Sequence, residues 1–181
     1  LQTSDIAEFH LLPLYERLPV PFRIASGVTL PAGVEYRFLR RRVQWQSAPQ
    51  RVWSFSGQHE TGEFYSGSRR QLTGTLTVRP SRGWLLSLTA DDNRVALAEG
   101  RFNARVWSGD VNTQFNPFVA LVNRLQYDTV SRQLGWQSRL RWITTPGNDI
   151  FLVYTHNWVD AGALRTLDTR AALKVVRTLR F

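Results

Sequence analysis

The stretch "WQSRLRWIT", residues 136–144, decides the fold because its side chains alternate in character with a period of two. In an extended chain, Leu140 and Trp142 fall on one side, whereas Arg139 and Arg141 fall on the other. Alternation over this length indicates a β-strand with one apolar face and one polar face.

Further runs of about ten residues show the same alternation, and turn residues separate them. These runs cover residues 39–47, 51–60, 71–79, 84–93, 105–115, 118–128, 150–158 and 171–181. No segment of comparable length shows a helical period. The chain is therefore predicted to be all-β, with its strands in antiparallel succession.

The connections between the predicted strands alternate between short and long. The short ones each contain proline and cover residues 48–50, 80–83, 116–117 and 145–148. The longer ones cover residues 61–70, 94–104, 129–135 and 159–170. Outer-membrane barrels have short periplasmic turns and longer outer loops, so the alternation favours such a barrel. A soluble up-and-down barrel with its apolar face inward is the alternative that this pattern leaves open.

Aromatic residues and glycines distinguish between these alternatives. Aromatic side chains lie near the strand ends, where the two interfaces of a membrane would place them: Trp53, Trp84, Phe115, Tyr127, Trp136, Trp142 and Trp158. Gly57, Gly74 and Gly109 lie on the apolar face, where a soluble core would need volume. We therefore predict an antiparallel transmembrane β-barrel of about ten strands, or the C-terminal part of a larger barrel.

A tenth strand is expected upstream, because single-chain bacterial barrels have an even number of strands. Residues 19–30 are the candidate for it. Residues 1–18 are accordingly predicted to be an N-terminal extension or loop, and residues 19–181 the outer-membrane barrel.

Two details do not fit the simplest pattern. Tyr36 and Phe38 are out of phase with Val43 and Trp45, which predicts a bulge or a loop between the two pairs. Arg177 falls on the apolar face of the last strand, so it is expected to snorkel toward the interface, or a bulge shifts the phase there.

The interior of the predicted barrel would be charged. The residues predicted to face the lumen are Arg40, Arg42, Arg79, Asp91, Asp110, Arg124, Asp128, Arg139, Arg141, Lys174 and Arg180, with Glu60 on the same parity. In a barrel of about ten strands these side chains would pair with one another and fill the interior. A basic lumen that favours anions is the alternative, and it would need a wider barrel.

Charge and histidine placement limit the other functions. The chain has 23 basic and 14 acidic residues, a net charge of +9, and no cysteine. Thiolate metal sites are excluded, and His10, His59 and His156 are too scattered to suggest zinc, so no metal or cofactor is expected. Arginines and tryptophans occupy opposite faces, which argues against nucleic acid as a partner.

The sequence ends in alternating apolar residues, of which Phe181, Leu179 and Val175 share one parity. This ending resembles the C-terminal signal that barrel-assembly machinery reads. We expect these three residues to form the assembly signal, with that machinery as a partner. The other expected partners are outer-membrane lipid and the remainder of a larger barrel or a partner subunit.

The predicted function is that of an integral module of the cell outer membrane, pore-like, uptake-associated or anchoring, without catalysis. The alternative is an outer-membrane enzyme, a hydrolase, with its site at the extracellular rim. "TADDN" (89–93) with His156 and Asp160 loosely suggests one, although their spacing matches no such motif.

Four stretches carry a resemblance to a known family. They are "PFRIASGVTLPAGVEYRF" (21–38), "GEFYSGSRRQLTGTLTVRPSRG" (62–83), "LAEGRF" (97–102) and "RLQYDTVSRQLGWQSRLRWITTPGNDIFLVYTHNW" (124–158). The chain resembles the C-terminal region of Gram-negative outer-membrane proteins that carry the domain of unknown function numbered 5916. Those proteins often place a family 9 carbohydrate-binding-like domain before the barrel, and this chain lacks that domain. The resemblance implies an outer-membrane barrel and supplies no catalytic residues.

Overall fold

The computed structural model describes residues 4–178, in which strands, turns and irregular segments account for the whole backbone. The all-β antiparallel prediction is confirmed. The strands are β1 Ile6–Arg17, β2 Phe22–Ala25, β3 Val28–Leu30, β4 Glu35–Gln46, β5 Trp53–Phe64, β6 Gly67–Val78, β7 Trp84–Leu97, β8 Gly100–Asn116, β9 Val119–Asp128, β10 Gln133–Thr145, β11 Asn148–Asp160 and β12 Leu164–Arg177. In the described part of the chain, no helix is long and apolar enough to cross a membrane.

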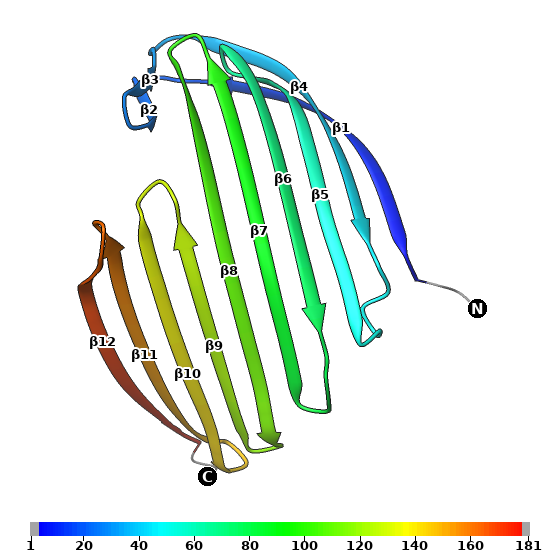
Figure 1. The fold of residues 1–181 in the computed structure, drawn as a ribbon, viewed down its shortest axis with the longest axis vertical. Helices are drawn as coiled ribbons and strands as arrows, with labels where there is room; N and C mark the ends of the chain where they lie inside the picture. The colour runs from blue at the N-terminus through cyan, green and yellow to red at the C-terminus, as the bar shows by residue number, and fades with distance from the viewer. Residues whose placement is uncertain (1–3, 179–181) are drawn as a thin grey trace. The chain divides into compact units, whose positions relative to one another are not determined.

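The strands are ordered simply. Ten of them form one sheet in the order β1-β4-β5-β6-β7-β8-β9-β10-β11-β12, and β2 and β3 form a separate hairpin (Figure 1). The chain divides into two compact units. The first unit comprises Leu1–Pro49, Ser54–Thr75 and Ala90–Arg105, and the second comprises Gln50–Trp53, Leu76–Thr89 and Val106–Phe181.

Register in the second unit follows the alternation seen in the sequence. Leu140 of β10 lies opposite Leu121 of β9 and Leu152 of β11, and Leu152 lies opposite Leu173 of β12. These leucines form one row across four strands. Because a slip of one residue would bring charged neighbours such as Arg139 into this row, the apolar pattern fixes the pairing.

Each face of the sheet is named here by its side chains. The polar face carries Arg40 and Glu60 in the first unit, and Asp110 and Arg124 in the second. The opposite face carries Val43 and Trp45 on β4, and the leucine row on β9 to β12. Arg139 and Arg141 are on the polar face, and Leu140 and Trp142 are on the opposite face, as the alternation predicts.

The position of the tenth strand was predicted wrongly. Residues 6–17, expected to lie outside the barrel, form β1 and pair along their whole length with β4. Residues 22–30, inside the stretch expected to form that strand, are the short β2–β3 hairpin instead. Residues 6–17 pair with β4 at all twelve positions, which satisfies the backbone hydrogen-bonding groups of that edge of β4. Residues 22–30 instead carry Val28 and Leu30, which become buried when the segment folds back as a hairpin.

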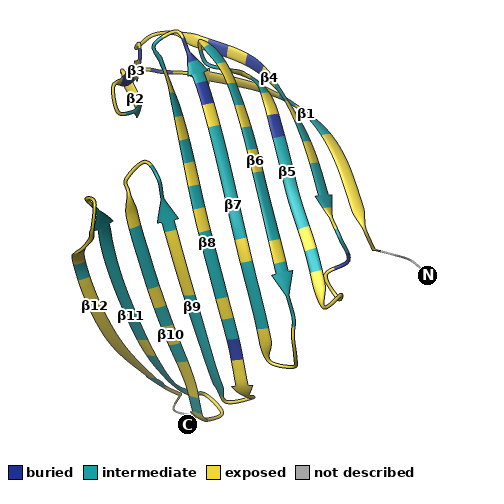
Figure 2. Ribbon diagram, viewed as in Figure 1, coloured by how far each residue is buried: buried dark blue, intermediate teal, exposed yellow. Residues whose placement is uncertain are grey.

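The bulge predicted between Tyr36 and Val43 was also wrong, since β4 pairs with β1 in unbroken register. Tyr36 and Phe38 lie on the polar face because they pack under the β2–β3 hairpin. The buried core of the first unit consists of Leu18, Val28, Leu30, Tyr36, Phe38, Val95 and Leu97. Leu30 has no exposed surface, and Figure 2 shows the buried positions of β3, β4 and β7 as dark segments.

Arg177 lies on the face that the alternation of residues predicts. It lies opposite Asn148 at the end of β12, on the opposite face, and the irregularity in the β11–β12 pairing lies at Asn157 and Trp158 instead. Its position at the last residue of the strand favours snorkelling over a shift of phase.

Candidate functional site

Glu60 is the centre of the charged site on the polar face of the first unit. Its side chain is almost fully buried, with 3% of its surface exposed. Arg40 donates to Glu60 Oε1 at 2.9 Å, and Arg42 donates from Nε and Nη2 to Oε2 at 2.8 and 2.7 Å. The alternation on β4 places both arginines on one side, two residues apart, so one carboxylate on β5 can accept from both.

A second network continues this face onto β6 and β7. Arg69 donates to Asn93 Oδ1 at 2.9 Å and to Gln71 Oε1 at 2.6 Å. Asp91 accepts from Gln71 at 2.7 Å and from Thr73 at 2.6 Å. The polar side chains of these strands are thus bonded to one another, which holds their rotamers in place.

The hydrophobic core borders this charged site. The Arg40 guanidinium lies over the rings of Phe38, at 5.0 Å, and Phe64, at 4.7 Å, and Arg69 lies 5.4 Å from Phe64. Cations over aromatic faces are attracted by the ring quadrupole. The arginines therefore connect the ion-pair network to an aromatic cluster, formed by Tyr36, Phe38, Phe64 and Tyr65, at the core under the hairpin.

The turn after β5 fastens this cluster to β1. Tyr65 donates to a carboxylate oxygen of Glu16 at 2.8 Å, and its ring meets that of Tyr36 edge to face. Burial raises the pKa of Tyr65 to about 12, and the hydrogen bond to Glu16 acts in the same direction.

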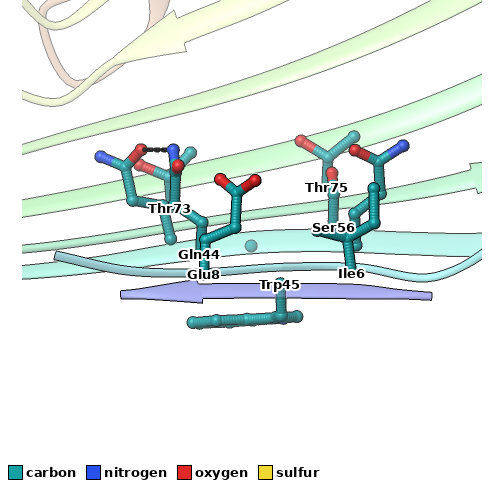
Figure 3. A pocket seen from close by; sticks show the side chains of 10 residues that line it. Ile6, Glu8, Gln44, Trp45, Ser56, Thr73 and Thr75 are labelled. Carbon is teal, nitrogen blue, oxygen red and sulfur yellow. Dashed lines mark hydrogen bonds between the residues drawn. The ribbon is translucent and has the colours of Figure 1, made fainter. Parts of the chain in front are cut away.

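Further along the polar face, the first unit has a hollow of about 320 Å³. Figure 3 shows the side chains of Glu8, Gln44, Ser56 and Thr73 on one side of the sheet, with Trp45 on the other. Gln44 donates to Gln58 at 2.8 Å. Most of its lining is hydroxyl and amide groups with the carboxylate of Glu8, and Ile6 adds an apolar side chain. Such a lining is suited to water and small polar solutes.

The polar face of the second unit has looser pairs. Arg124 donates from Nε to Asp110 at 2.8 Å, and Arg141 lies 3.3 Å from Asp149. Both arginines are half exposed. Asp128 binds the β9–β10 turn, accepting from the Val130 N–H and the Ser131 hydroxyl, rather than an arginine.

The structure places most of the residues predicted to line a lumen on the polar face. Those on it are Arg40, Arg42, Asp91, Asp110, Arg124, Asp128, Arg139, Arg141 and Lys174. Arg79 follows the last residue of β6 and bonds through its N–H to Val52. Arg180, Leu179 and Phe181 lie outside the described residues. Val175 lies on the opposite face across from Ile150, and two thirds of its surface is exposed.

His156, the histidine of the enzyme alternative, lies on the opposite face. It stacks on Trp158 at 4.0 Å between ring centroids and shares hydrogen bonds with the hydroxyls of Tyr154 and Thr166, each at 3.0 Å. Asp160, the acid near it in sequence, accepts from Gly162 and pairs with Arg132. Among residues 4–178, no group of three or more potential metal ligands is found.

Sequence reasoning missed several residues of the site. Arg69, Gln71 and Asn93 lie an even number of residues from nearby predicted lumen residues, such as Arg79 and Asp91. This spacing was the signal that could have identified them. The hairpin around Leu30 carried no such signal, because its burial depends on a fold-back that short-range alternation does not encode.

No known family model matches the chain, and no curated protein matches it in sequence. Among solved structures, it is similar to a KdgM porin, also solved in complex with disordered oligogalacturonate. That similarity has 10% identity and a TM-score of 0.43, over 98% of this chain and 100% of that one. It is also similar to a NanC porin, with 14% identity and a TM-score of 0.45, over 96% of this chain and 94% of that one. Similarities this distant establish neither a family nor a shared ligand.

Proposed function

We propose that this chain is an integral β-barrel of the outer membrane, with its opposite face against lipid and its polar face lining the interior. Its role is that of a pore-like, uptake-associated or anchoring module. The proposal includes the relationship to the proteins with the domain of unknown function numbered 5916, in which this chain corresponds to a C-terminal barrel region.

One observation carries the proposal: large apolar side chains are exposed on the face that lacks a core. They include Phe9, Val43, Phe55, Leu72, Leu76, Trp84, Leu88, Trp107, Val111, Leu125, Trp142, Leu152, Leu173 and Val175. Water-soluble proteins rarely expose contiguous apolar patches of this kind. In a lipid bilayer the same surface is matched to its surroundings, and ladders on both sides satisfy the backbone of β4 to β11.

The charged residues support the same orientation. Buried Glu60 and its arginines lie on the polar face. On the opposite face of β9 to β11, the one charged residue among those described is Asp160, at the very end of β11. A barrel of this kind alternates apolar-out with polar-in along each strand. The glycines on the opposite face are not packed as in a core. The indole of Trp45 covers Gly57, and a side chain at Gly74 would meet nothing within 4 Å, as on a surface that faces lipid.

The interior is proposed to be occupied rather than open. A ten-stranded barrel is only slightly wider than the eight-stranded size that side chains fill. The β2–β3 hairpin adds a folded segment on the polar face, and Glu60 already binds two arginines. We expect little or no conductance from the isolated chain in planar bilayers, with an anion preference if any current is seen. Large, cation-selective steps would contradict an occupied, basic interior.

Assembly and partners complete the proposal. Phe181, Leu179 and Val175 form the signal for the barrel-assembly machinery, and lipid covers the opposite face. The remainder of a larger barrel or a partner subunit is the further partner. Deletion of Phe181 should lower the amount that reaches the outer membrane, whereas refolding into detergent should be unchanged.

Cysteine labelling at two neighbouring residues tests the orientation. Leu140→Cys should react with a bilayer-phase probe in reconstituted vesicles, and Arg139→Cys should not, because they lie on different faces of β10. Heat-modifiable migration on a denaturing gel provides the control for folding. Equal labelling of the two cysteines in folded protein would overturn the assignment.

A further inference from the structure

The opposite face of the first unit is not apolar along its whole length, so the expectation that arginines and tryptophans occupy opposite faces is wrong in this part of the sheet. Exposed arginines gather on it toward the end at which β4 begins and β7 ends. The arginine belt comprises Arg37 and Arg41 on β4, Arg70 on β6, Arg94 on β7, and Arg101 and Arg105 on β8. Arg17, the last residue of β1, shares this face and lies opposite Glu35.

Alternation and contacts place these residues on one face. Arg40 and Arg42 are on the polar face, so Arg37 and Arg41 are on the other side of β4. Arg69 bonds to Asn93 on the polar face, which puts Arg70 and Arg94 on the opposite one. Arg105 binds Asp92, which also binds Arg94, so β8 presents its arginines on the same side.

The change from basic to apolar is abrupt. Within a step of two residues, Arg41 is followed by Val43 on β4, Arg70 by Leu72 on β6, and Arg105 by Trp107 on β8. Trp107 has half of its surface exposed. An apolar surface that meets a row of cations with an aromatic residue at the boundary is the pattern of a membrane–water interface.

Strand length agrees with this boundary. β8 has 17 residues, whereas a tilted strand needs about 9–11 to cross a bilayer. The apolar positions of β8 on this face run from Trp107 to Phe115. Arg101 and Arg105 therefore belong to the part of β8 that is not needed to cross the bilayer. The belt therefore lies just beyond the hydrocarbon, at the depth of headgroups.

The belt carries excess positive charge. Glu35, Glu63 and Asp92 are the acids on this part of the face, against the six arginines of the belt and Arg17. Glu63 accepts from the Leu39 N–H, and Asp92 is shared between Arg94 and Arg105. In the described part of the chain, Arg41, Arg70 and Arg101 form no ion pair, so their guanidinium groups are available to a partner.

We propose that the arginine belt binds the phosphate groups of anionic lipids in the leaflet that surrounds this end of the strands. The proposal rests on the proposed membrane orientation. Guanidinium groups bind phosphate in a bidentate geometry, and basic residues next to a membrane gain from its negative surface potential. The belt would hold the strands at a fixed depth and select anionic lipids as neighbours.

Lipid selectivity measured by tryptophan quenching tests the belt. The full chain is refolded into vesicles that contain brominated phosphatidylglycerol or brominated phosphatidylcholine, and the ratio of their association constants is determined. We expect a ratio of roughly fivefold or more in favour of phosphatidylglycerol, falling in high salt. The triple variant R41Q/R70Q/R101Q should bring the ratio close to one.

A matched variant controls for net charge. R139Q/R165Q/R170Q removes the same three charges from the polar face of the second unit and should leave the ratio at its original value. Quenching by both lipids with a ratio near one in the unmodified chain would overturn the belt while leaving the membrane orientation intact. An equal loss of selectivity in the two variants would also overturn it. Absence of quenching by either lipid would overturn the membrane orientation, and the belt with it.

Discussion

The two units are built from the same alternating strands, but they hold different interiors. Every buried apolar residue of residues 4–178 belongs to the first unit, where the β2–β3 hairpin covers Tyr36, Phe38, Val95 and Leu97. The second unit has ladder hydrogen bonds and half-exposed ion pairs instead, such as that of Arg124 with Asp110.

This difference shows what a core requires in such a fold. A single sheet cannot bury its own side chains, because a face needs another element against it. In the first unit the β2–β3 hairpin is that element, and the hydrogen-bonded charged residues lie beside the core that it covers. The second unit has none within the described residues, so its strands depend on pairing and on the medium around them.

The largest expected effect comes from breaking the buried charge site. Glu60→Gln should lower the free energy of unfolding by about 3–5 kcal/mol, because Arg40 and Arg42 lose their carboxylate. Asp110→Asn in the second unit should cost about 1 kcal/mol or less, since Arg124 is exposed. Urea unfolding followed by tryptophan fluorescence in detergent measures both. Equal losses would show that the two interiors do not differ in this way.

Removing the cover from the core should have a slightly smaller effect. Leu30→Ala should lower the free energy of unfolding by about 2–5 kcal/mol, because Leu30 is fully buried under the hairpin. Faster tryptic cleavage after Arg23 on β2 should accompany this loss. Leu173→Ala in the second unit is the control, since Leu173 is 68% exposed and should change neither measurement as much. An unchanged cleavage rate in Leu30→Ala would mean that Leu30 does not hold the hairpin.

A charge introduced on the opposite face should destabilise the second unit more than the first, and this is the next largest effect. Leu152→Arg should cost about 2–4 kcal/mol in vesicles, because the leucine row of the second unit faces hydrocarbon. Leu39→Arg should cost about 0–1 kcal/mol, because Leu39 lies between Arg37 and Arg41 at the interface. Refolding equilibria in urea with vesicles measure the difference. A cost at Leu39 as large as that at Leu152 would place both residues at the same depth.

The smallest effect is expected at Tyr65. Tyr65→Phe removes the hydrogen bond to Glu16 and should cost roughly 1 kcal/mol near pH 8. The pKa of Tyr65 is about 12 in the fold against 10.0 for an ordinary tyrosine, so the unfolded chain loses this proton first as the pH rises. The stability that Tyr65 contributes is therefore complete below pH 10 and declines between pH 10 and 12. The difference between the two proteins should narrow over that range, and a constant difference would contradict the linkage.

Much of the fold follows from period-two alternation. It predicted the strands around Leu140, Trp107 and Leu76, and it separated Arg139 and Arg141 from their apolar neighbours, because side chains alternate on any extended chain. It also grouped Arg40, Arg42 and Glu60, although parity alone could not show that one carboxylate serves two arginines.

The sequence by itself determined most of the strands from residue 39 onward and the faces of their side chains, because these depend on neighbours two residues apart. Tertiary structure alone decided that residues 6–17 pair with β4 and that residues 22–30 fold back as a hairpin. It also decided that Tyr36 and Phe38 face the polar side, against the phase of Val43 and Trp45. Those outcomes depend on which distant segment covers an apolar side chain, and local alternation carries no information about a partner sixty residues away such as Val95 or Leu97.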